Sequence, residues 1–212
     1  MIIRINNNNY CIIIPQKSGI STITNIVGYD LMSSLYTKDY ANFPTKSKVR
    51  KVMDDHNRLI YVGDTDDIVF AKENNIKIDF TFGVVREPIS RFKSCYRDRV
   101  VRKNKDKLKD NSVDFVVNNL QQLIDSGTDF GMHARPQVDW LGKNYEIYDS
   151  IIKTKQINLK LKPLISKELG INIPDIRSNK SGHSEVYLNR KNISILKEFY
   201  KEDYKLFYSL PL

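Results

Sequence analysis

Two short apolar runs place the strongest constraint on how this chain folds. Cys11–Ile14 and Phe80–Val85 are continuous, and each ends directly at a polar loop. A run of this kind is typical of a strand that is buried on both faces. After each loop, apolar residues return at helical spacing, from Ile23 in the first case and from Ile89 in the second. The repeated order of strand, loop and helix predicts an α/β protein.

The rest of the chain continues this alternation. We expect strands at 59–62 and 145–152, and helices at 112–127, 159–169 and from Asn189 onward. Strands that alternate with helices form a parallel sheet covered on both faces, which predicts a three-layer α/β/α architecture with a central parallel sheet. The 212 residues fit one medium domain, and no repeat or linker divides them, so we expect a single domain over residues 1–212.

The charge of the chain indicates an anionic partner. The formal net charge is +9, and the segment 86–109 holds ten Lys and Arg against three Asp and Glu. Such a field attracts nucleic acid, membrane headgroups, nucleotides and sulfated or phosphorylated sugars, and charge alone does not choose among them. A solvated basic helix face explains the segment equally well.

The cysteines and the N-terminal segment indicate a cytoplasmic protein. Cys11 and Cys95 are too few for a disulfide framework and are expected to be reduced. The apolar run Tyr10–Ile14 ends at Pro15 and is too short for a signal-peptide core. No stretch approaches the ~20 apolar residues of a membrane span. We therefore expect a cytoplasmic location and no membrane span.

The loop after the first strand has the composition of a phosphate cradle. Ligands bind at the carboxyl ends of strands in such sheets, and this loop runs from Pro15 to Thr22. Glycine permits a tight turn around an anion, hydroxyls and backbone N–H groups donate, and the helix N-terminus is electropositive. The expected binding residues are Lys17, Ser18, Gly19, Ile20, Ser21 and Thr22. The Walker pattern is absent, and an ordinary turn is the alternative interpretation.

The loop after the second strand adds a second anion site. Arg86 follows Phe80–Val85, Pro88 is placed to open a helix, and Ser94 follows on that helix. A guanidinium and a hydroxyl can therefore converge on one anion beside the first loop. This arrangement of Arg, Pro and Ser is far less expected by chance than the first loop.

Together the two loops resemble the sulfotransferase superfamily that uses 3′-phosphoadenosine 5′-phosphosulfate, especially its carbohydrate-modifying, Golgi-type branch. In that family a loop of the form Pro-Lys-x-Gly-x-x-[Ser/Thr] wraps the 5′-phosphosulfate, and Arg-x-Pro-x-x-Arg-x-x-Ser-x-Tyr holds the 3′-phosphate. Lys17–Thr22 is similar to the first form, although Gln16 separates Pro15 from the lysine. The second form is matched by Arg86, Pro88, Arg91, Ser94 and Tyr96.

Further segments are similar to the family in the same order along the chain. They are His133–Gln137, Tyr148–Lys153 and Tyr200–Phe207. The resemblance implies a P-loop-NTPase-like sulfotransferase fold, and a late loop with Lys180 and Ser181 that folds over the nucleotide. It also implies 3′-phosphoadenosine 5′-phosphosulfate as the donor, adenosine 3′,5′-bisphosphate as the product, and a hydroxyl-bearing acceptor such as a saccharide or glycoconjugate. No metal is required.

The chemistry implied by this resemblance assigns two roles. Sulfuryl transfer is similar to phosphoryl transfer, in which positioning and electrostatics dominate, and Lys17 is expected to neutralise charge on the leaving oxygen. A base near neutral pKa is expected for the acceptor hydroxyl, and His is the usual choice. His56 is preferred, because several relatives carry their catalytic His between the two loops, and His133 ranks next.

Each of these histidines has a plainer interpretation. His56 also fits a solvated loop residue, and His133 also fits a residue that orients a loop by hydrogen bonding. His183 lies in a Gly-Ser loop where exposure is expected. A carboxylate, Asp64 or Glu87, is the alternative base.

Two other functional classes compete with this interpretation. A nucleotide kinase-like P-loop enzyme shares the strand–loop–helix cradle, but the missing Walker string disfavours it. A basic nucleic-acid-binding module is compatible with the charge, but no aromatic ladder or recognised motif accompanies the basic residues. We therefore expect no nucleic-acid partner.

Overall fold

The computed structural model describes residues 1–29, 31, 46–55, 59–61, 71, 73–104, 106–176 and 185–208. The chain forms two compact units that interleave in sequence. The sheet unit takes Met1–Ile14, Gly19–Val84 and Asn144–Ser181, and the helical unit takes Pro15–Ser18, Val85–Lys143 and Gly182–Leu212. The single domain predicted over residues 1–212 stays a prediction.

The sheet has the strand order β3-β1-β2-β4-β5. Its strands are β1 (Ile2–Ile5), β2 (Asn8–Ile13), β3 (Leu59–Tyr61), β4 (Phe80–Val85) and β5 (Ser150–Lys153). β2 and β4 are parallel, and β1 runs antiparallel to β2 and to β3, so that β2, β3 and β4 share one direction. The turn between β1 and β2 contains Asn6 at φ 52°, a left-handed conformation that Asn tolerates better than most residues.

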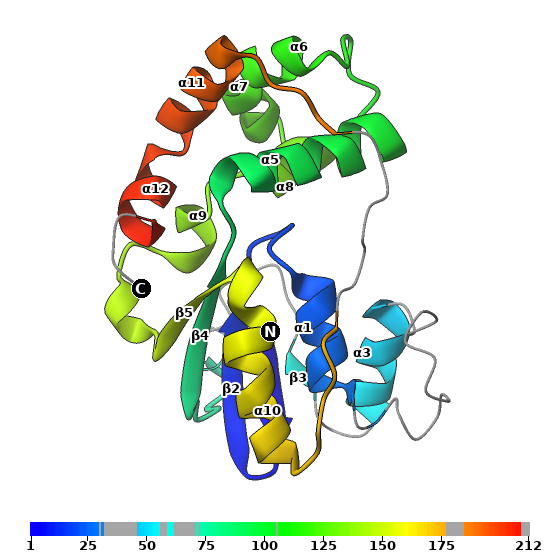
Figure 1. Cartoon of the computed structure of the whole chain (residues 1–212), viewed down its shortest axis with the longest axis vertical. Helices are drawn as coiled ribbons and strands as arrows, with labels where there is room; N and C mark the ends of the chain where they lie inside the picture. Colours follow the sequence, from blue (N-terminus) through cyan, green and yellow to red (C-terminus); the bar gives the residue numbers. More distant parts are fainter. Residues whose placement is uncertain are drawn as a thin grey trace. The chain divides into compact units, whose positions relative to one another are not determined.

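Helices cover the sheet within the same unit. They are α1 (Ile20–Val27), α3 (Lys46–Asp55), α10 (Lys162–Leu169), the short 3-10 helices η3 (Tyr145–Ile147) and η4 (Thr154–Gln156), and the π-helix η5 (Ile157–Leu161). α1 and α10 lie side by side against the sheet (Figure 1). Their apolar faces and the strands form one core, in which Ile12, Ile23 and Ile165 are fully buried. Burial of this kind is the main stabilising term of the unit.

The helical unit is built around one long helical segment. α5 (Pro88–Tyr96) continues directly into η2 (Arg97–Lys103), a π-helix. The other helices are α6 (Val113–Asn118), α7 (Leu120–Asp125), α8 (Asp129–Ala134), α9 (Val138–Leu141), α11 (Arg190–Phe199) and α12 (Lys201–Phe207). In the core of the helical unit, the rings of Phe92 and Phe130 pack edge to face with their centroids 6.0 Å apart. Tyr200 is also fully buried there.

The predicted α/β class is confirmed, and several element boundaries agree closely. The run Phe80–Val85 is a strand along its whole length, and Pro88 is the first residue of α5. Ser112 caps α6, where its Oγ accepts the N–H of Phe115 at 3.2 Å. Gly170 ends α10 in a left-handed conformation. These signals are local, which explains why the sequence predicts them.

Other elements differ from the prediction. β1 was not predicted, and it makes the sheet mixed because it opposes its neighbours. The helix expected at 112–127 is divided at Asn119 into α6 and α7. The strand expected at 145–152 begins as the turn η3 and becomes β5 only at Ser150. Val62 lies outside the described residues.

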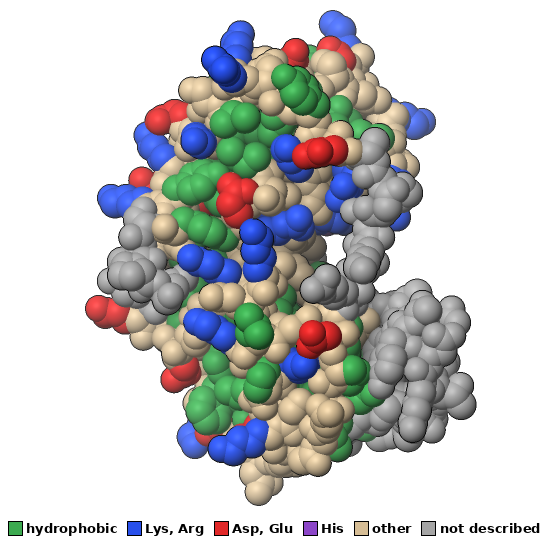
Figure 2. All heavy atoms as spheres, in the orientation of Figure 1, with side chains coloured by type: hydrophobic (Ala, Val, Ile, Leu, Met, Phe, Trp, Pro, Cys, Tyr) green, Lys and Arg blue, Asp and Glu red, His purple; other side chains and the backbone are tan. Residues whose placement is uncertain are grey.

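The surface carries the basic charge of the sequence. Figure 2 shows that Lys and Arg side chains predominate over Asp and Glu on the face displayed. In the part of the chain that the structure describes, no helix combines the length and the apolar character needed to cross a bilayer.

Candidate functional site

The loop after β2 brings two left-handed residues close together. Lys17 has φ 66° and Gly19 has φ 100°, and Gly19 is the N-cap of α1. The left-handed backbone favours glycine at position 19, and a Cβ there would lie 2.7 Å from the Cδ1 atom of Ile157, so this side-chain end would have to shift. Gly19 has no side chain with which to cap α1, and the first turn of α1 contains no acidic residue. This helix start therefore keeps the positive end of its dipole for an anion.

Arg86 lies against this loop. Its Nη1 donates a hydrogen bond of 2.9 Å to the backbone carbonyl of Lys17, so the two predicted anion-binding residues are neighbours in the helical unit. Burial, and then the nearby charges of Arg97 and Arg91, lower the pKa of Arg86. A guanidinium has five N–H donors. A partly buried arginine among other cations is suited to bind an anion.

Gln137 fixes the backbone of Arg86. Its side-chain amide accepts the N–H of Arg86 at 2.8 Å and donates to the carbonyl of Arg86 at 2.8 Å. The same Oε1 receives the hydroxyl of Ser18 at 3.4 Å. Gln137 is completely buried. One amide therefore contacts a residue of each predicted loop.

Asp203 of α12 supports Gln137 in turn. Its carboxylate accepts the backbone N–H groups of Gln137 and Val138, each at 2.9 Å, and so caps α9. Burial raises the pKa of Asp203, although these hydrogen bonds act in the opposite direction. Sequence reasoning missed both residues as parts of the site. They lie inside the segments His133–Gln137 and Tyr200–Phe207, whose resemblance to the family gave the only signal.

Glu87 caps the helix that follows Arg86. Its carboxylate accepts the N–H of Ile89 at 3.1 Å and that of Ser90 at 2.7 Å, and also accepts the hydroxyl of Tyr204. Burial works against the charged form, but the hydrogen bonds from Tyr204 and Ser90 outweigh it and lower the pKa of Glu87. A carboxylate engaged in this way is a helix cap and a poor candidate for the alternative base.

The two remaining polar residues of the second loop differ in their environment. Arg91 is 1 % exposed and donates to the carbonyls of His133, Ala134 and Arg135 at the end of α8, so its charge serves the fold. Ser94 is half-buried on α5, and its hydroxyl has no hydrogen-bond partner among the described residues. Ser94 is thus available to a ligand, whereas Arg91 is not.

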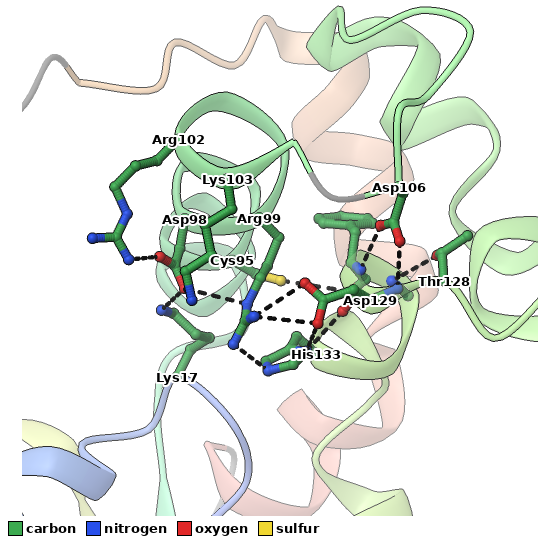
Figure 3. Close-up of polar contacts among 12 residues, drawn as sticks. Lys17, Cys95, Asp98, Arg99, Arg102, Lys103, Asp106, Thr128, Asp129 and His133 are labelled. Atoms are coloured by element: carbon green, nitrogen blue, oxygen red, sulfur yellow. Dashed lines mark hydrogen bonds and ion pairs between the residues drawn. The ribbon is translucent and has the colours of Figure 1, made fainter. Parts of the chain in front are cut away.

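The ammonium of Lys17 forms an ion pair with Asp98. Lys17 Nζ lies 2.9 Å from Asp98 Oδ2, and the two side chains are 21 % and 12 % exposed. Asp98 also meets Arg99 Nε at 3.2 Å, Lys103 Nζ at 4.0 Å and the guanidinium of Arg102 (Figure 3). Burial would raise the pKa of Asp98, but hydrogen bonds from Lys17 and Arg102 outweigh it and hold that pKa well below its ordinary value.

His133 contacts Arg99, one of the cations around Asp98. Its Nδ1 is 2.7 Å from the carbonyl oxygen of Asp129, and its Nε2 contacts the Nη2 atom of Arg99. Because a carbonyl and a guanidinium fix the two ring nitrogens as donor and acceptor, the imidazole is neutral with its proton on Nδ1. Burial lowers the pKa of His133, and the charge of Arg99 acts in the same direction. The lone pair of Nε2 is therefore occupied, which favours a positioning role, while a role as the base stays a prediction.

Several predicted residues lie outside the described part of the chain. They are His56, Asp64, Lys180, Ser181 and His183. Within the described ranges, no three His, Cys, Asp or Glu side chains are grouped as a metal site requires. Within the helical unit, the described residues bring Lys17 and Arg86 together, and these two cations are complementary to an anion such as a phosphate or sulfate.

Comparison with known proteins agrees with this chemistry. The sequence pattern described as "Sulfotransferase family" matches residues 6–209, which is nearly the whole chain. A search of curated proteins gave no match.

Proposed function

This chain belongs to the sulfotransferase family, and on that premise we propose that it moves a sulfuryl group from 3′-phosphoadenosine 5′-phosphosulfate to a hydroxyl of a carbohydrate. The observation that carries the proposal is the hydrogen bond of 2.9 Å from Arg86 to the carbonyl of Lys17. It supports a single site in which two cations from loops far apart in sequence serve one ligand with two anionic ends.

The residues of the site have complementary roles in this proposal. Lys17 would hold the 5′ end of the nucleotide, and Arg86 with Ser94 would hold the 3′-phosphate. When bound, the nucleotide supplies the activated sulfuryl group. The ammonium of Lys17 would balance negative charge that develops on the leaving oxygen, a contribution typically worth ~2.7–4 kcal/mol. Loss of this charge in Lys17→Ala is therefore expected to lower kcat about 100-fold or more.

The acceptor hydroxyl requires a proton acceptor. We propose His56 for this role because of its place between the two loops in the sequence. His133 is the second candidate, although its Nε2 is already in contact with Arg99. If neither His56→Ala nor His133→Ala lowers turnover at least about tenfold, the assignment of a histidine base is wrong.

A carbohydrate acceptor and a cytoplasmic location complete the proposal. The resemblance of the second loop to the carbohydrate-modifying branch supports the acceptor class. Cys11 and Cys95 are both buried, and burial raises the pKa of Cys95 to about 12, which fits reduced thiols. Transfer from labelled donor to a panel of sugars and phenols identifies the acceptor, and fractionation of the source cells tests the location.

Ligand-induced thermal stabilisation tests the proposed nucleotide. Adenosine 3′,5′-bisphosphate at 100 times its dissociation constant should add ~2.7 kcal/mol to the free energy of unfolding. ATP and a DNA duplex serve as comparisons, because they represent the kinase-like and nucleic-acid alternatives. Stabilisation by ATP or DNA without stabilisation by the bisphosphate would overturn the proposal.

A further inference from the structure

Lys17 is fixed at both ends by residues of the helical unit. Arg86 holds its backbone carbonyl at 2.9 Å, and Asp98 holds its ammonium at 2.9 Å. Its backbone is left-handed, with φ 66°, a conformation that is unfavourable for a non-glycine residue. A side chain that is held in this way points in one direction, and Asp98 sets that direction.

The environment of Asp98 is strongly cationic. Arg99, Arg102 and Lys103 surround the same carboxylate that binds Lys17 (Figure 3). η2 makes this possible, because a π-helix places residues four and five positions apart on one side, and Arg102 and Lys103 stand in that relation to Asp98. One carboxylate thus faces four cations, as a bound anion would.

We propose that Asp98 is a positioning residue that acts through Lys17: it orients the ammonium for the sulfuryl donor and also competes with that donor for it. This inference rests on the proposed function of Lys17. It assigns a role to a residue that the sequence showed only as an acidic exception in a basic segment.

The two effects follow from the chemistry of an ammonium. Lys17 Nζ has three N–H donors, and the one directed at Asp98 fixes the directions of the other two. Loss of that constraint lowers the fraction of bound complexes with the ammonium in place, and small misplacements cost up to about 100-fold in rate. The negative charge of Asp98 also weakens the attraction between Lys17 and an anionic ligand.

Asp98→Asn should therefore shift binding and turnover in opposite directions. We expect the dissociation constant for adenosine 3′,5′-bisphosphate to fall severalfold, and kcat to fall about tenfold or more. Calorimetric titration measures the first quantity, and steady-state kinetics with saturating donor measure the second. Asp98→Glu keeps the charge and should return the dissociation constant to near its original value, with a kcat above that of Asp98→Asn.

A double-mutant cycle tests whether Asp98 acts through Lys17. In the Lys17→Ala background, Asp98→Asn should leave kcat unchanged, because the group that Asp98 orients is absent. An equal loss of kcat in both backgrounds would show that Asp98 does not work through Lys17, and would overturn the inference.

The chain offers a matched control for the loss of an aspartate. Asp175 pairs with Lys162 at 2.6 Å in the sheet unit, so Asp175→Asn makes the same chemical change away from the site. It should leave kcat and the dissociation constant unchanged. If repulsion among the remaining cations unfolds Asp98→Asn, the same comparison is made in the Arg102→Gln background, where one of them is absent.

The outcomes separate this inference from the proposed function. If the unchanged protein binds no bisphosphate, the proposed function fails. If it binds the bisphosphate and Asp98→Asn weakens binding, or leaves kcat unchanged, the inference fails while the proposed function stands. Tighter binding together with slower turnover supports both.

Discussion

Arg86 donates a hydrogen bond from its guanidinium to the carbonyl of Lys17, at 2.9 Å, although the two residues are 69 positions apart in sequence. This contact joins the two loops that carry nearly all of the predicted chemistry. It depends on residues behind it, because Gln137 holds both backbone polar groups of Arg86. The account can therefore be tested at the supporting residues as well as at the site.

The first prediction concerns Gln137. Gln137→Ala removes the partners of the partly buried N–H and carbonyl of Arg86, and each such loss typically costs ~1–3 kcal/mol. We expect the free energy of unfolding to fall by about 2–4 kcal/mol in urea titrations, together with weaker binding of adenosine 3′,5′-bisphosphate. On the surface, the side-chain amide of Gln121 donates a hydrogen bond of 2.8 Å to the carboxylate of Asp125. Gln121→Ala is therefore the control and should change stability by less than about 0.5 kcal/mol. Equal effects of the two substitutions would contradict this role of Gln137.

The second prediction separates a structural arginine from a ligand-binding one. Arg91 is buried and donates to three carbonyls, so Arg91→Met should lower the free energy of unfolding by about 3 kcal/mol or more. Arg135 forms a half-exposed ion pair with Asp139 at 3.6 Å, and Arg135→Met should cost less than about 1 kcal/mol. Chemical denaturation measures both. A mild effect of Arg91→Met on stability, with a large loss of nucleotide binding, would show that Arg91 binds the nucleotide and would contradict this prediction.

The third prediction concerns pH. The pKa of His133 is lowered in the fold, so below its ordinary value near 6.5 the unfolded chain binds a proton that the folded protein resists. Acid therefore favours unfolding, and stability should fall as the pH decreases from about 7 to 5, by at most ~1.4 kcal/mol per pH unit from this group. His133→Gln should flatten that part of the profile. Denaturation at a series of pH values measures the slopes, and identical slopes in both proteins would refute the assignment.

The element boundaries that depend on neighbouring residues could be predicted from the sequence. The strand before Arg86, the opening of α5 at Pro88 and the cap at Ser112 all depend on residues within one or two turns. β1 was missed because its residues Ile2–Ile5 are few and are followed by asparagines, which read as a loop. Its stability comes from pairing on both sides, which a single segment does not reveal.

The contacts among the polar side chains of the site were harder to predict from the sequence. Asp98 and Asp203 act on residues more than 60 positions away, and no periodicity or spacing records such a pair. Arg91 and Arg86 belong to one motif, yet the fold buries the first against carbonyls and leaves the second beside Lys17. Composition identifies the groups that can bind an anion, whereas tertiary packing decides which of them are already occupied.

The ligand preference of Arg86→Ala tests the central claim most directly. If Arg86 binds the 3′-phosphate, calorimetric titration should show that the unchanged protein prefers adenosine 3′,5′-bisphosphate over adenosine 5′-monophosphate by about 10-fold or more, as charged hydrogen bonds of ~1.5–3 kcal/mol imply. In Arg86→Ala the two nucleotides should bind with nearly equal affinity. A preference that survives the substitution, or equal binding by the unchanged protein, would contradict the account.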